Sequence, residues 1–76
     1  MAIYVKFTDV ELKTRIKDFI KAKLQRLMLD GSGFNGVELA ILKSWILKTF
    51  PDVSDATLLA VRNELKASGI IEEVTV

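Results

Sequence analysis

The sequence predicts an α+β domain in which three helices pack with a small antiparallel sheet made from the two ends of the chain. Three observations support this fold class. Residues 2–7 and 70–76 both have the composition of β-strands. Between them lie three stretches with the helical spacing of apolar residues, and a glycine or a proline ends each one. No linker, repeat or low-complexity tract divides the 76 residues, so residues 1–76 are expected to form a single domain.

The first strand, residues 2–7, is rich in β-branched and aromatic residues. A helix over residues 9–29 should follow, because the Thr8 hydroxyl can accept a hydrogen bond from the first turn and Glu11 stands at capping-box spacing. Residues 30–33, Asp-Gly-Ser-Gly, favour a loop after it. The apolar stripe of this helix follows the 3.6-residue period and consists of Leu12, Ile16, Phe19, Ile20, Leu24 and Leu27.

The first helix is also basic. Its cations fall within a short stretch that contains only Asp18 as an acid, whereas the net charge of the whole chain is +1. Any attraction to nucleic acid would therefore be local. Two interpretations remain open, a solvated helix surface and a contact surface for an acidic partner. The cations are Lys13, Arg15, Lys17, Lys21, Lys23 and Arg26.

The second helix should begin near Gly36 or Val37 and continue to about Phe50, because Pro51 lacks the N–H that would continue it. Its apolar residues fall on two nearly opposite sides, so both sides need cover. The second side is covered by the N-terminal strand or the first helix, or it contacts a partner protein or a second copy. One side holds Leu39, Leu42, Ile46 and Phe50, and the other holds Val37, Ile41 and Trp45.

The third helix is expected over residues 54–68. Ser54 is a favourable N-cap, Asp55 suits the positive end of the helix dipole, and Gly69 suits the position after the last turn. Its buried stripe should be Leu58, Val61 and Leu65. Residues 70–76 should then form a strand that pairs with residues 2–7 and protects the exposed edge of each.

This order of elements resembles the winged helix-turn-helix superfamily over roughly residues 37–76. The stretch FPDVSDATLLAVRNELKASGII is similar to that family's turn, recognition helix and first wing strand. The resemblance implies a small regulator of transcription that binds double-stranded DNA with the third helix in the major groove. It assigns the DNA contacts to Ser54 and Thr57 at the helix start and to the outward positions Leu59, Arg62, Asn63 and Lys66.

Two features depart from that pattern. A carboxylate at Asp55 would repel phosphate near the helix start, and Glu72 and Glu73 stand where a basic wing would be. The alternative function is therefore a non-enzymatic protein-interaction module. Such a module would use the basic first helix or the Val37, Ile41 and Trp45 patch, which could also form a homodimer interface.

Composition argues against catalysis. The chain has no His and no Cys, which removes the commonest metal ligand and the usual acid-base group at neutral pH. The glycine-rich residues 30–36 lack the GxxxxGK[ST] pattern of a phosphate loop. We therefore expect no enzymatic activity, no metal and no cofactor. No apolar run approaches the roughly 18 residues of a membrane span, so we expect no membrane partner and a cytoplasmic location.

Overall fold

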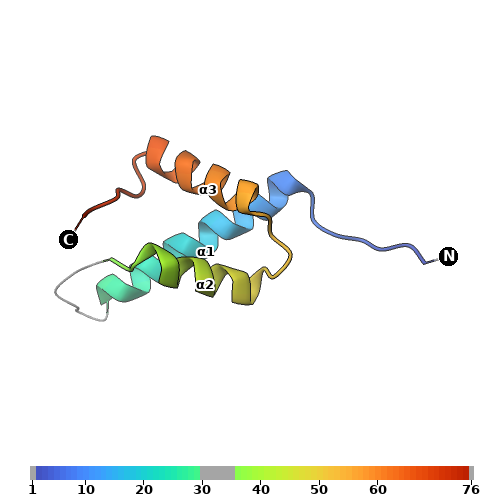
Figure 1. The fold of residues 1–76 in the computed structure, drawn as a ribbon, viewed down its shortest axis with the longest axis horizontal. Coiled ribbons are helices and arrows are strands. Elements are labelled where there is room, and N and C mark those ends of the chain that lie inside the picture. Colours follow the sequence, from blue (N-terminus) through green and yellow to red (C-terminus); the bar gives the residue numbers. More distant parts are fainter. Residues whose placement is uncertain (1, 30–35, 76) are drawn as a thin grey trace.

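The computed structural model describes residues 2–29 and 36–75, which form three helices (Figure 1). Helix α1 spans Asp9–Leu29, α2 spans Leu39–Thr49 and α3 spans Asp55–Ala67. The longest helix, α1, packs against both of the others, whereas α2 and α3 make their main contacts with α1 rather than with each other. The prediction of three helices is confirmed.

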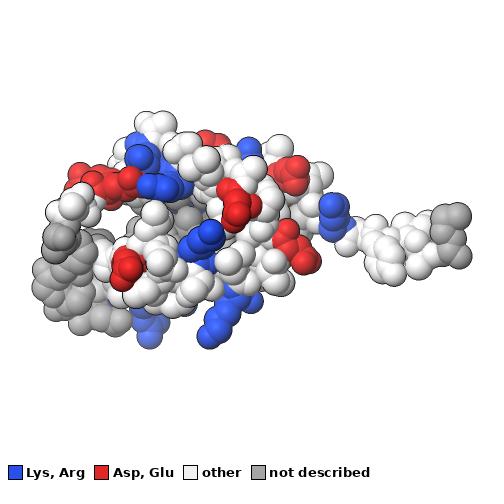
Figure 2. All heavy atoms as spheres, in the orientation of Figure 1, with Lys and Arg blue, Asp and Glu red and all other residues white. Residues whose placement is uncertain are grey.

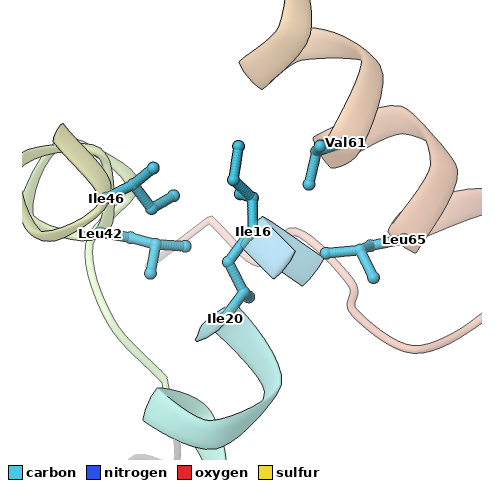
Figure 3. Packing of buried hydrophobic residues seen from close by; sticks show 6 residues of the cluster. All are labelled: Ile16, Ile20, Leu42, Ile46, Val61 and Leu65. Atoms are coloured by element: carbon cyan, nitrogen blue, oxygen red, sulfur yellow. The ribbon is translucent and has the colours of Figure 1, made fainter. Parts of the chain in front are cut away.

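The core lies where the three helices meet, and each helix contributes two buried side chains that point toward one another (Figure 3). Ile16 of α1 is fully enclosed at the centre of this cluster. Phe19 and Phe50 extend the packing with an edge-to-face ring contact, their centroids 5.9 Å apart. The buried residues are Ile16, Ile20, Leu42, Ile46, Val61 and Leu65.

Local signals set the helix ends. Thr8 Oγ1 accepts a hydrogen bond from the Glu11 N–H at 3.2 Å, as the capping-box spacing predicts. Gly69, at a φ of +74°, lets the chain leave α3 through a Schellman motif in which the Ile70 N–H donates to the Leu65 carbonyl at 3.1 Å. Helix α2 has no side-chain cap at Glu38 and begins two to three residues later than expected.

The prediction of an α+β fold is wrong. Within residues 2–29 and 36–75 no residue belongs to a strand, so this part of the chain is all-α. Residues 2–7 form an arm that extends away from the helices, and residues 70–75 leave the opposite end of the molecule (Figure 1). The predicted loop at residues 30–33 and the predicted end of the last strand at Val76 lie outside the described residues.

The direction of the helices explains why the two segments do not pair. Helix α3 runs in the same general direction as α1, so the arm before α1 and the segment after α3 emerge at opposite ends (Figure 1). A helix of the length of α1, 21 residues, is about 31 Å long. Strand composition favours an extended backbone, but a sheet also needs a neighbouring strand within about 5 Å.

Candidate functional site

The start of α3 is built by Ser54 and Thr57. The Ser54 Oγ accepts a hydrogen bond from the Thr57 N–H at 3.2 Å, and the two hydroxyl oxygens lie 2.9 Å apart. This contact satisfies one of the free N–H groups of the first helical turn. The two residues predicted to meet phosphate therefore form the helix cap.

Two predicted DNA contacts, Arg62 and Lys66, converge on a single carboxylate. Arg62 Nε donates to Glu73 Oε1, and Lys66 Nζ lies 3.4 Å from the other oxygen, Oε2. Glu73 belongs to the segment after α3, which changes direction at Gly69 and brings the carboxylate within reach of both cations. The other predicted contacts of the helix face, Leu59 and Asn63, are exposed and not joined to this cluster by a hydrogen bond or an ion pair.

The contact changes the electrostatics of both partners. The hydrogen bond from Arg62 lowers the pKa of the Glu73 carboxyl, and Lys66 adds to the lowering. The same hydrogen bond raises the pKa of Arg62. Glu73 therefore stays ionised to a lower pH than an ordinary glutamate and neutralises one of the two cations.

Asp55 does not lie free at the start of α3. Its carboxylate is 3.4 Å from the ammonium of Lys43 on α2, and the Asp55 side chain is 89% exposed. Asp55 was expected to repel phosphate, and it also pairs with Lys43, a cation that could attract phosphate. An ion pair this exposed contributes little to stability.

The basic surface of α1 is largely engaged within the molecule. Glu64 of α3 accepts from Lys17 at 2.9 Å and lies 3.8 Å from Lys13. The Arg15 guanidinium lies 4.0 Å from the Phe7 ring centroid and also pairs with Glu11. Figure 2 accordingly shows basic and acidic side chains interspersed on the face it presents. That face shows no continuous basic surface of the kind that favours nonspecific binding to nucleic acid.

The predicted Val37, Ile41 and Trp45 patch is divided by the packing. Val37 and Trp45 lie against the core, and Ile41 alone of the three is exposed, at 43%. The Lys23 ammonium lies 5.6 Å from the Trp45 ring centroid, so its side chain covers part of the indole. Trp45 is thus covered by α1 and the core rather than by an N-terminal strand.

Sequence reasoning missed a groove between α2 and α3. It is hollowed between the two helices and bounded at one end by residues 70–75 (Figure 2). Leu39 and Leu59, 49% and 52% exposed, contribute to its lining from α2 and α3. The helical period placed Leu39 on one apolar side of the second helix, and the family resemblance placed Leu59 among the DNA contacts. No signal in the sequence brings the two together.

Other kinds of site find no support in the described residues. Across residues 2–29 and 36–75, no group of three potential metal ligands lies together. In the same part of the chain, no helix is long and apolar enough to cross a membrane. A comparison with known proteins finds no family model, no curated protein and no solved structure that matches the chain.

Proposed function

We propose that the protein binds double-stranded DNA through the face of α3 that carries Arg62 and Lys66. The observation behind this proposal is that the two cations, one helical turn apart, reach the two oxygens of one carboxylate. A DNA phosphate offers a similar pair of anionic oxygens to convergent donors. The order of α2, a turn over residues 50–54, and α3 also supports a helix-turn-helix reader.

Glu73 is then an internal competitor for the DNA. Its side chain is 41% exposed, and so is that of Lys66, so water and salt screen the contact. Phosphates of the DNA would replace the Glu73 carboxylate as the partners of Arg62 and Lys66. The segment after α3 would then be released from the helix. The Arg62 guanidinium, once released, has the planar fork that can donate to O6 and N7 of a guanine.

Salt titrations with random-sequence duplex DNA and with duplexes of several defined sequences test this function. Glu73→Gln should tighten binding several-fold because it frees both cations, and Arg62→Ala should weaken it by about tenfold. Lys66→Ala should weaken binding to all sequences alike and lower the salt slope by about one unit.

The matched control is Glu72→Gln, which changes the net charge equally, while Glu72 has no ion-pair partner in the described part of the chain. Equal effects of Glu73→Gln and Glu72→Gln would show that net charge sets the affinity, and not the contact of Glu73 with Arg62 and Lys66. Affinity no stronger than about 10⁻⁴ M at low salt would reject DNA binding.

A second candidate function is protein docking through the groove between α2 and α3. The specific observation in its favour is that Leu39 and Leu59 are about half exposed and line one groove from two helices. Apolar side chains gathered in a groove gain free energy when another apolar segment removes them from water. Docking on this groove does not require a basic surface, and the ion pair of Arg62 and Glu73 forms part of the lining.

A further inference from the structure

The N-terminal arm, residues 2–7, exposes large apolar side chains. Ile3, Tyr4 and Val5 are 91%, 89% and 95% exposed, and the arm extends away from the helices (Figure 1). At its base Phe7 lies against the Arg15 guanidinium. Three successive large side chains in water form the kind of surface that other proteins bury.

The groove between α2 and α3 offers the complementary surface. Its lining includes the half-exposed side chains Leu39, Leu59 and Ile70 together with buried core residues beneath them. The groove and the arm are thus two incompletely covered apolar surfaces of the same chain. Burial of apolar surface contributes about 25 cal/mol per Å².

The charges of the two surfaces are also complementary. Lys6 on the arm has no ion-pair partner among the described residues. Glu38 and Glu72, which contribute to the lining of the groove, have none there either. An arm that enters the groove can therefore bring its one cation near unpaired acids at the rim.

We propose that the arm of one copy docks in the groove of a second copy, so that the protein self-associates by exchanging arms. This inference rests on the second candidate function, docking in the groove, and names the docked segment. Reciprocal exchange uses the same contact twice and closes as a two-fold dimer.

The direction of the arm favours a second copy over the arm's own groove. Residues 2–7 point away from the helices, so the arm is presented to its surroundings rather than to the groove of its own copy (Figure 1). The arm begins at the start of α1, and residues 70–75 bound the groove toward the opposite end (Figure 1). Folding back would also turn the chain at Phe7 and disturb its contact with Arg15.

Sedimentation equilibrium of the full chain without DNA tests the proposal. The wild-type chain should show a concentration-dependent dimer. Ile3→Asp in the arm and Leu59→Asp in the groove should each give a monomer, because each places a charge in the apolar contact. Both positions are exposed, and circular dichroism checks that the helices remain.

The matched control is Val10→Asp, which adds the same charge at an exposed position of α1 outside the arm and the groove. This variant should dimerise like the wild-type chain. An equimolar mixture of Ile3→Asp and Leu59→Asp should recover a heterodimer, because one intact arm then meets one intact groove. Its single contact should make it weaker than the wild-type dimer.

Three outcomes would overturn the proposal. A wild-type chain that stays monomeric at every concentration would exclude a second copy as the source of the docked arm. The same result is expected if the arm folds onto its own groove. A Leu59→Asp variant that still dimerises would place the arm elsewhere. A dimeric Ile3→Asp variant beside a monomeric Leu59→Asp variant would remove the arm as the occupant but would leave docking in the groove intact.

Discussion

The two sides of α3 are built differently. The side that faces α1 is sealed, with Val61 and Leu65 each 1% exposed and Glu64 joined to two lysines of α1. The side that faces α2 is open, because Leu59 is 52% exposed and, within residues 2–29 and 36–75, Arg62 forms an ion pair with Glu73 alone. The same helix therefore stabilises the fold on one side and leaves side chains for binding on the other.

The reason for this difference is the position of α1. With 21 residues it is long enough to lie under both shorter helices, and each of them buries its apolar stripe against it. Helices α2 and α3, with 11 and 13 residues, then have no comparable contact with each other. The groove follows from a core that one central helix organises.

The largest expected effect separates the two sides with the same substitution. Leu65→Ala should lower the free energy of unfolding by about 2–5 kcal/mol, because it leaves a cavity in the core. Leu59→Ala on the open side should change it by no more than about 0.5 kcal/mol. Urea denaturation of the two variants, in dilute solution that favours the monomer, measures the difference. Equal losses would mean that the groove is closed in solution.

A smaller effect is expected at the start of α3, where both sides depend on one cap. Ser54→Ala removes the acceptor of the Thr57 N–H and should cost about 1 kcal/mol of stability. Ser44→Ala is the control, because the Ser44 hydroxyl donates to the Ile41 carbonyl within α2 and caps no helix. Thermal denaturation compares the two. A Ser54→Ala variant as stable as Ser44→Ala would show that Asp55 or water replaces the cap.

The smallest effect concerns the ion pairs that join the sealed side of α3 to α1. The hydrogen bond from Lys17 lowers the pKa of Glu64, and Lys13 adds to the lowering. A carboxyl whose folded pKa is lowered contributes stability above its unfolded pKa, and this contribution is lost as the pH falls through the folded pKa. Glu64→Gln should therefore lower the melting temperature slightly at pH 7.

The difference between Glu64→Gln and the wild-type chain should vanish in acid, below the pKa of Glu64. The control is Asp18→Asn, because Asp18 pairs with Lys21 within α1 and joins no other helix. Its melting temperature should follow that of the wild-type chain more closely at pH 7. A difference for Glu64→Gln that persists in strong acid would assign the effect to packing rather than to charge.

The predicted site was only partly recoverable from sequence. The helical period placed Arg62 and Lys66 on neighbouring turns of α3, and the structure agrees. It could not show that Glu73 takes both cations, because that contact depends on how the chain turns after Gly69. The sequence also could not show that the packing separates Ile41 from Val37 and Trp45. The second helix has apolar residues on two sides, and only the positions of the neighbouring helices decide which of these residues are buried.

The sequence by itself determined where the helices lie, because caps, glycines and proline act within a few residues of themselves. Thr8, Ser54 and Gly69 carry their effect in any arrangement of the chain. Tertiary structure alone decided the fold class, the groove and the ion pairs of Glu73 with Arg62 and Lys66. Each of these depends on distances between segments far apart along the chain or on opposite sides of a turn, and those distances are set by how α2 and α3 pack on α1.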